Sequence, residues 1–349
     1  MGFGLMKTEK FWLLTIMRNL PRIMTSPPDP VFVLRGANAP VTCVTFLEYT
    51  GPGKIQRIAA GTQEGQVFIW DLKTSSIVCK WTGHPGSSIV WIHSLVPGKL
   101  WTQGRHDNIK LWDITALPPE AESQYPLVDY LGFSKCSLTC LPNGNSLLAV
   151  PGPDQVGVTV WDTKTKYKIC SLVPQDAKSR GSLMQVVWLN TEEHIQPLVA
   201  YESGHISLWD WSNTSVISET RVNDNPICLS FHTDSKTGIV GTASEKVFVF
   251  KIDDNLSITI AKEIQITNPG VSSCITRSDG KIFALGGWDS RIRLFSSKKC
   301  KPLAVLQYHK KTVECLAYSK CNVEHYGFGY ILAAGSSDHS ISLWNIFNT

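Results

Sequence analysis

The chain has 349 residues, 43% of them apolar, and Lys and Arg outnumber Asp and Glu by only 33 to 29. It is long enough for one large domain or two ordinary ones. The near balance of charge argues against binding to nucleic acid or an anionic membrane, because both need concentrated positive charge. No apolar run approaches the roughly 20 residues of a membrane-spanning helix, so neither nucleic acid nor membrane is an expected partner.

The first 29 residues stand apart from the pattern that follows them. Their basic start and the apolar stretch FWLLTIMRNL at 11–20 are compatible with a signal or transit peptide. The stretch is short, however, and Pro21 follows it without a small-residue cleavage pattern. We therefore expect residues 1–29 to form a disordered or weakly helical extension, within which Met24 is a second candidate start of translation.

Seven aromatic residues recur along the rest of the chain at intervals of 41 to 49 residues. Each ends a short segment in which apolar β-formers stand one and three positions before the aromatic. This period of two predicts a β-strand rather than a helix. The recurring aromatics are Trp70, Trp112, Trp161, Trp209, Phe250, Phe295 and Trp344, and Asp follows the first four of them.

Turn-forming sequences precede these strands, among them GRHDN at 104–108 and GWDSR at 287–291. Several repeats hold a further strand upstream, such as VTCVTF at 41–46. Evenly spaced strands joined by Gly-rich turns build four-stranded blades around a central axis. The sequence therefore predicts an all-β protein, a single seven-bladed β-propeller over residues 30–349. We expect LPPEAESQYP at 117–126 to be a spacer loop between two blades, with a peptide dock as the alternative.

Closure of the ring is also predicted. The seventh repeat lacks an outermost strand of its own, whereas VFVLRG at 31–36 reads as a strand ahead of the first repeat. Unpaired strand edges invite aggregation. We expect the N-terminal strand to pair with the last blade.

These repeats resemble the WD-repeat family, in which a blade opens with Gly-His and ends with Trp-Asp, and an Asp in the intervening turn binds the His. Two repeats carry this set, although Tyr308 replaces the Gly in the seventh. Elsewhere the pattern decays: Ala37 stands where the first repeat would have His, and the sixth repeat keeps Asp289 but ends in Phe295. The sets are His84, Asp107 and Trp112 in the second repeat and His309, Asp338 and Trp344 in the seventh.

In this fold we expect His84 and His309 to be buried hydrogen-bonding residues rather than general bases or ligands. The sequence holds no G-x-S-x-G elbow, no H-E-x-x-H zinc motif and no G-x-x-x-x-G-K-[ST] phosphate loop. The ten cysteines are scattered without a Cys-x-x-Cys pair, which favours buried thiols in a reducing compartment over a zinc site. We expect a protein that is not an enzyme, with no cofactor and no metal.

Within this family the arrangement is similar to the guanine nucleotide-binding protein β-like proteins. The resemblance implies a cochaperone-type scaffold that supports maturation of phosphatidylinositol-kinase-related protein kinases and DNA-damage signalling, in cytoplasm and nucleus. We also expect a chain that is monomeric on its own. A G-protein γ subunit is not an expected partner, because the residues before the propeller contain three prolines, a fourth follows at Pro30, and there is no sustained heptad. The segments that carry the likeness are 27–36, 100–113, 266–270, 286–295 and 302–309.

A partner surface is expected on the turns beside the central channel. A large aromatic next to Arg is typical of binding hot spots, although Trp288 packed against a neighbouring blade is an alternative. The second functional hypothesis is a peptide-motif reader or adaptor, for example for a ubiquitin ligase, with an acidic or aromatic cage around the channel mouth. The candidate surface residues are Arg105, His106, Trp288, Asp289 and Arg291.

Overall fold

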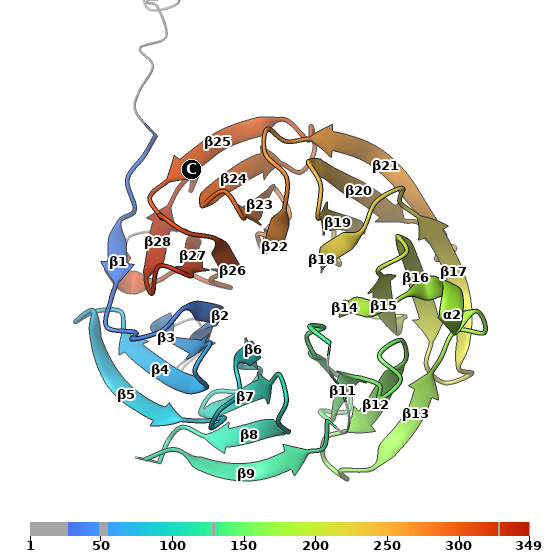
Figure 1. Cartoon of the computed structure of the whole chain (residues 1–349), viewed down its shortest axis with the longest axis horizontal. Helices are drawn as coiled ribbons and strands as arrows, with labels where there is room; N and C mark the ends of the chain where they lie inside the picture. Colours follow the sequence, from blue (N-terminus) through green and yellow to red (C-terminus); the bar gives the residue numbers. More distant parts are fainter. Residues whose placement is uncertain are drawn as a thin grey trace, which may run out of the picture.

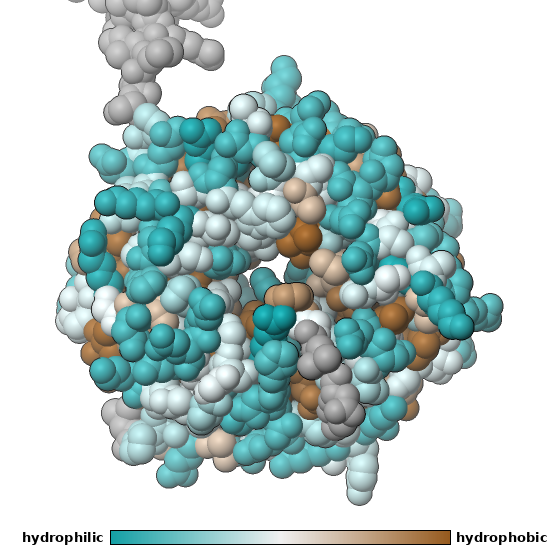
Figure 2. Space-filling view, viewed as in Figure 1, coloured by the Kyte–Doolittle hydropathy of each residue, from teal (hydrophilic) through white to brown (hydrophobic). Residues whose placement is uncertain are grey.

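The computed structural model describes residues 27–48, 55–116, 118–127, 130, 132–326 and 329–348. Their strands form seven antiparallel four-stranded sheets, which stand as blades around a central channel (Figure 1). The predicted seven-bladed β-propeller is confirmed. Figure 2 shows the channel opening at the centre of one face, whose surface is mainly hydrophilic with scattered apolar residues.

In blades 1 to 6 the four strands run in chain order from the channel to the rim. Blade 1 contains β2 (Val41–Glu48), β3 (Ile55–Thr62), β4 (Gln66–Asp71) and β5 (Ser76–Thr82). Blade 2 contains β6 (Ile89–His93), β7 (Lys99–Gly104), β8 (Ile109–Asp113) and β9 (Glu120–Tyr125). Blade 3 contains β10 (Ser137–Cys140), β11 (Ser146–Pro151), β12 (Val158–Asp162) and β13 (Lys168–Leu172).

The second half of the ring repeats this plan until the last blade. Blade 4 contains β14 (Leu183–Asn190), β15 (Ile195–Tyr201), β16 (His205–Asp210) and β17 (Ser215–Arg221), preceded by the short helix α2 (Ala177–Arg180). Blade 5 contains β18 (Pro226–His232), β19 (Thr237–Thr242), β20 (Lys246–Ile252) and β21 (Ile258–Gln265). Blade 6 contains β22 (Val271–Thr276), β23 (Ile282–Gly287), β24 (Arg291–Ser296) and β25 (Pro302–Gln307). Blade 7 contains β26 (Val313–Tyr318), β27 (Ile331–Ser336), β28 (Ile341–Asn345) and β1 (Phe32–Leu34), with the 3₁₀-helix η1 (Glu324–Tyr326) between β26 and β27.

The spacer loop predicted at 117–126 is wrong over most of its length, because Glu120–Tyr125 forms β9, the rim strand of blade 2. β9 pairs with β8, and Tyr125 lies opposite Ile109. The polar composition that suggested a loop suits an edge strand, which proteins often protect with charged residues. Tyr125 alone is buried, with its ring centroid 5.4 Å from that of Trp101 and 6.1 Å from that of Trp161.

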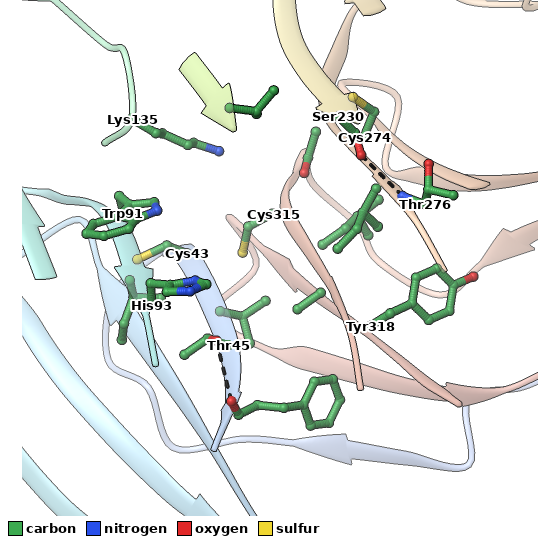
Figure 3. A pocket seen from close by; sticks show the side chains of 18 of the residues that line it. Cys43, Thr45, Trp91, His93, Lys135, Ser230, Cys274, Thr276, Cys315 and Tyr318 are labelled. Carbon is green, nitrogen blue, oxygen red and sulfur yellow. Dashed lines mark hydrogen bonds between the residues drawn. The ribbon is translucent and has the colours of Figure 1, made fainter. Parts of the chain in front are cut away.

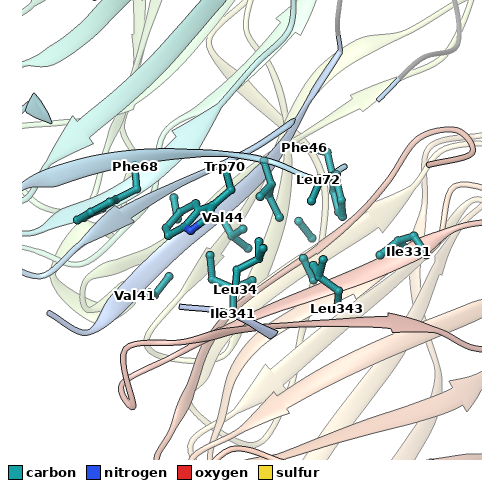
Figure 4. Packing of buried hydrophobic residues seen from close by; sticks show 14 of the residues in the cluster. Leu34, Val41, Val44, Phe46, Phe68, Trp70, Leu72, Ile331, Ile341 and Leu343 are labelled. Atoms are coloured by element: carbon teal, nitrogen blue, oxygen red, sulfur yellow. The ribbon is translucent and has the colours of Figure 1, made fainter. Parts of the chain in front are cut away.

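The N-terminal strand closes the ring, as the sequence predicted. β1 pairs antiparallel with β28, so that Phe32 lies opposite Leu343 and Leu34 opposite Ile341. Leu34 is 1% exposed and belongs to an apolar cluster shared by blades 7 and 1 (Figure 4). The next residue, Arg35, accepts a hydrogen bond at its carbonyl from the Trp70 indole, 3.1 Å away in blade 1. The same short segment therefore joins the first blade to the last.

Neighbouring blades approach closely where a glycine is the penultimate residue of the second strand. A Cβ on Gly61 would lie 2.7 Å from a side-chain carbon of Ile89 in the next blade and 2.7 Å from the Cys43 sulfur. Gly241 and Gly335 occupy equivalent positions, facing Val271 and Val41 of the following blades. A side chain at any of these positions would force two blades apart, so glycine is required by close approach rather than by backbone conformation.

Residues 1–26 of the predicted extension, and with them Met24, lie outside the described residues. Within the described ranges, no helix has the length and apolar character needed to cross a membrane.

Closure by β1 makes a prediction about truncated chains. Deletion of residues 1–36 should lower the melting temperature and broaden the unfolding transition, since it exposes the edge of β28. Leu34→Ala should cost about 2–5 kcal/mol of unfolding free energy because it leaves a cavity in the shared cluster. Both are measured by thermal and denaturant unfolding. Deletion of residues 1–24, the control, should leave stability unchanged. If the wild type and both truncated chains melted at the same temperature, the closure would be contradicted.

Candidate protein-binding surfaces

The His84 set is internal to blade 2. His84 is fully buried, and its Nδ1 donates to the Asp107 carboxylate at 2.9 Å. Its Nε2 accepts from the Thr102 hydroxyl at 2.7 Å, and that oxygen accepts from the Trp112 indole at 2.8 Å. Both ring nitrogens of His84 are hydrogen-bonded, so neither is available to act as a general base. The bonds connect the loop, the turn and two strands of blade 2.

Burial sets the ionisation of His84, whereas hydrogen bonds set that of Asp107. Burial lowers the pKa of His84 from 6.5 to about 4, although the Asp107 carboxylate acts in the opposite direction. Burial also raises the pKa of Asp107, but hydrogen bonds from Lys110, the Asn108 backbone and His84 outweigh it and hold that pKa below its usual value. Near neutral pH the set therefore contains a neutral imidazole and a carboxylate.

Blade 7 builds the equivalent set with one difference. His309 lies 3.0 Å from the Asp338 carboxylate and 2.7 Å from the Ser342 hydroxyl, which accepts from the Trp344 indole at 2.7 Å. Ser342 comes from the third strand, β28, whereas Thr102 comes from the second strand of blade 2. The hydroxyl that links the histidine to the tryptophan can thus come from either of two paired strands, the second or the third of the blade.

In blade 6 the carboxylate of the turn is bound by an arginine on the third strand, β24, and not by a histidine. Arg293 is 4% exposed and holds the Asp289 carboxylate through two nitrogens, at 2.6 and 3.0 Å. Asp289 was predicted as a surface residue for a partner, but its carboxylate is committed to this pair. The pair fixes the turn that carries Trp288 and Arg291.

Blade 4 contains a charged cluster for which the sequence reading gave no role. Arg180 is 7% exposed and donates to Asp176 at 2.7 Å and to Glu219 at 2.7 Å, and Glu219 also accepts from Ser207 at 3.1 Å. The only sequence signal was Ser207, two residues before the recurring Trp209, at the position that Ser342 and Arg293 hold in their own blades. Because the partners come from α2 and its N-cap, the third strand β16 and the rim strand β17, their spacing in the sequence does not predict that they meet.

Trp288 projects from the turn between β23 and β24 and is 46% exposed. One side of its indole lies against Gly270, where an added Cβ would be 2.1 Å from two ring carbons. Its backbone N–H donates to the Gly270 carbonyl at 3.0 Å. Trp288 is therefore a fixed aromatic that packs on the loop leading into its own blade and leaves nearly half of its surface open.

Arg105 and His106 lie in the turn between β7 and β8 of blade 2. His106 is exposed, and the Arg105 guanidinium stacks on the ring of Phe133, 3.8 Å from its centroid. Phe133 is 66% exposed. Blades 1 and 7 separate blade 2 from blade 6 in the ring. The structure therefore places the predicted surface in two parts, Arg105 with His106 and Trp288 with Arg291.

The central channel contains a cavity of about 450 Å³ lined mainly by the innermost strands (Figure 3). Aromatic side chains line it, including Trp91, whose ring lies parallel to that of His93 at 5.7 Å. No Asp or Glu is among the described residues of the lining. The channel thus has aromatic walls but lacks the carboxylates of the acidic cage considered for a cationic peptide.

The channel thiols are unsuited to nucleophilic chemistry. Burial raises the pKa of Cys43 to about 12, and it raises the pKa values of Cys274 and Cys315 well above their usual range. A protonated thiol is a poor nucleophile and a poor metal ligand. Among the described residues, no three His, Cys, Asp or Glu side chains are grouped to hold a metal ion.

Comparison with known proteins places these features in a family. Residues 300–345 match the family described as WD domain, G-beta repeat. Over 325 residues the chain is 34% identical to guanine nucleotide-binding protein subunit beta-like protein 1 of Mus musculus, covering 92% of this chain and 97% of the mouse protein. The chain belongs to this beta-like protein 1 family of WD-repeat propellers.

More distant relatives share the name ASTRA-associated protein 1. The protein of Verticillium alfalfae is 23% identical over 93% of this chain and 95% of its own length. That of Schizosaccharomyces pombe is 24% identical over 92% of this chain and 99% of its own length. The likeness of this chain to these fungal proteins therefore extends over nearly the full length of both.

The hydrogen bond between His84 and Asp107 can be tested by a double-mutant cycle. His84→Ala and Asp107→Ala should each lower the unfolding free energy by roughly 1–3 kcal/mol, because each removes the hydrogen bond between them and Asp107→Ala leaves the buried His84 Nδ1 without its acceptor. The double variant should cost less than the sum of the two, by roughly 1 kcal/mol. Denaturant unfolding of the four proteins measures this coupling, and strict additivity would show that the two side chains do not interact.

The lowered pKa of His84 also predicts a pH dependence. The unfolded chain takes up a proton near pH 6.5, whereas the folded chain resists it until about pH 4. The contribution of His84 is therefore fully present above pH 6.5 and lost as the pH falls toward 4. Between pH 7 and pH 5 it amounts to about 2 kcal/mol. Unfolding curves at both pH values should show a smaller difference for His84→Ala than for the wild type; identical differences would contradict the assignment.

Proposed function

We propose that this chain is a non-enzymatic, cochaperone-type scaffold that supports the maturation or stability of phosphatidylinositol-kinase-related protein kinases. The full-length likeness to relatives named for association with ASTRA carries the proposal. A role in DNA-damage signalling would follow from the function of these kinases. We propose that the protein is located in the cytoplasm and the nucleus. Its partners are proteins in a complex, and a G-protein γ subunit is not among them.

The chemistry of the described residues supports a binding role. The buried polar groups of blades 2, 4, 6 and 7 pair with one another inside their blades, and burial keeps the channel thiols protonated. Such groups stabilise a rigid ring and have no evident part in a reaction. A rigid ring that presents fixed loops on its faces is suited to holding other proteins.

Trp288 is the side chain that we propose as a partner contact. Its backbone is bound to Gly270, and the ion pair between Asp289 and Arg293 fixes the turn that follows it. A half-exposed aromatic that is already held in place loses little conformational freedom on binding, which is typical of a hot spot. Arg291, at the start of β24, lies on the far side of the same turn.

The test is affinity purification of the tagged chain followed by mass spectrometry, with kinase levels measured after depletion of the protein. We expect kinase-assembly components to co-purify and kinase levels to fall. Trp288→Ala should weaken capture by about 2 kcal/mol or more with little change in melting temperature, because the side chain is half exposed.

Tyr167→Ala provides a matched control for Trp288→Ala, since Tyr167 is an aromatic that is 75% exposed on blade 3. The Tyr167→Ala variant should bind the partner proteins with the same affinity as the wild type. Intact capture by Trp288→Ala with a collapsed melting temperature would assign Trp288 to the fold alone. Purification with ubiquitin-ligase subunits and no kinase-assembly component would favour an adaptor instead.

A further inference from the structure

Two cations lie beside the central channel without a carboxylate partner. Lys135 precedes β10 and lines the cavity, and Arg105 reaches the same segment by stacking on Phe133. Neither side chain forms a hydrogen bond or ion pair with a described residue, and the Arg105 Nε is buried without a partner. We call Arg105, Phe133 and Lys135 the Lys135 cluster.

The segment that carries Lys135 is held firmly. The amide of Gln103, a fully buried side chain, donates to the Ser134 carbonyl at 3.0 Å and accepts from the Cys136 N–H at 2.8 Å. The Ser134 N–H donates to the Tyr130 hydroxyl at 2.7 Å. The backbone on both sides of Lys135 is therefore clamped to blade 2, and the lysine is presented to the channel by a built support.

The ammonium of Lys135 is directed toward the open channel. In Figure 3 it extends into the space between Cys43 and Cys315 on one side and Ser230 and Cys274 on the other. Its charge opposes the effect of burial on the pKa values of Cys43, Cys274 and Cys315, which belong to three different blades. The charge of Lys135 therefore reaches thiols on three adjacent blades of the channel wall.

The surroundings leave this charge unneutralised. The described lining contains Lys135, Lys320 and His93 but no Asp or Glu, and burial lowers the pKa of His93 to about 4. Glu314, on β26, is outside the lining and accepts a hydrogen bond from Ser337 at 2.6 Å. A concave site with one sign of charge and low-dielectric walls attracts the opposite charge strongly.

We propose that the Lys135 cluster binds an acidic peptide segment of a partner protein at the channel opening. Lys135 would receive one anionic group inside the channel, and the flat Arg105 guanidinium would receive a second at the edge, where it can bind a carboxylate or phosphate through two nitrogens. The exposed face of Phe133 would pack against an apolar residue of the same segment. This inference deepens the proposed function and rests on it only in requiring protein partners.

Fluorescence anisotropy of the purified full chain tests the site. The probes are three short fluorescein-labelled peptides of one length: one rich in Asp and Glu, one with phosphoserine in place of those residues, and one with Gln and Asn. We expect an anionic peptide to bind and the Gln/Asn peptide not to bind. Preference for the phosphoserine probe would assign phosphorylated segments, and equal binding of the two anionic probes would assign carboxylate-rich segments.

Charge variants test whether the anionic peptide binds at the Lys135 cluster. Lys135→Glu and Arg105→Gln should each weaken binding of the anionic peptide by roughly tenfold or more. The control is Lys80→Glu, which makes the same charge change on the exposed rim strand β5 and should stay within about twofold. Thermal melting of each variant confirms that it is folded.

Three results would overturn the proposal: no binding of either anionic peptide at low salt, equal weakening by Lys80→Glu and Lys135→Glu, or tighter binding of a single-stranded oligonucleotide than of the peptides. Failure of the proposed function is separate from these results. If kinase-assembly components do not co-purify while the peptide measurements give the expected pattern, the cluster keeps its assignment and the cellular role is wrong.

Discussion

The pairing of β1 with β28 is the contact on which the rest of the molecule depends. Each blade buries one face on the blade before it and the other on the blade after it, so no blade has a complete core by itself. A break anywhere would expose two faces and one strand edge. Three residues of β1 prevent this by completing blade 7, while Leu34 and the Arg35 carbonyl contact blade 1. The closure therefore also holds in place the loops that carry the two candidate binding surfaces, Trp288 with Arg291 and the Lys135 cluster.

Inside the blades, polar groups perform a similar task with varied chemistry. Blades 2 and 7 use His, Asp and a hydroxyl, blade 6 uses an Asp and Arg pair, and blade 4 uses Arg180 with two carboxylates. Each arrangement joins the loop or turn at one end of the blade to its strands. What these blades share is therefore a polar link between a loop or turn and the strands, and the residue types that form the link differ from blade to blade.

Much of the fold could be predicted from the sequence, because the strand period and the recurring aromatics are local signals. The sequence failed at β9, where a rim strand needs so few apolar residues that EAESQY is typical of a loop as well. The surface was harder. Trp288 and Arg105 occupy equivalent regions of two repeats, and only the ring order shows that two blades lie between them. Phe133 and Lys135 carry no motif, and the contacts that orient their segment, through Gln103 and Tyr130, are visible only in three dimensions.

The closure also orders events during synthesis. Phe32 is synthesised well before its partner Leu343, because six complete blades lie between them in the chain. At about 5–20 residues per second, β1 waits for tens of seconds while six blades are completed beside it. During that interval its edge and the apolar side chain of Leu34 are open to other chains. A ring closed in this way is open to association with other chains until its last blade is made.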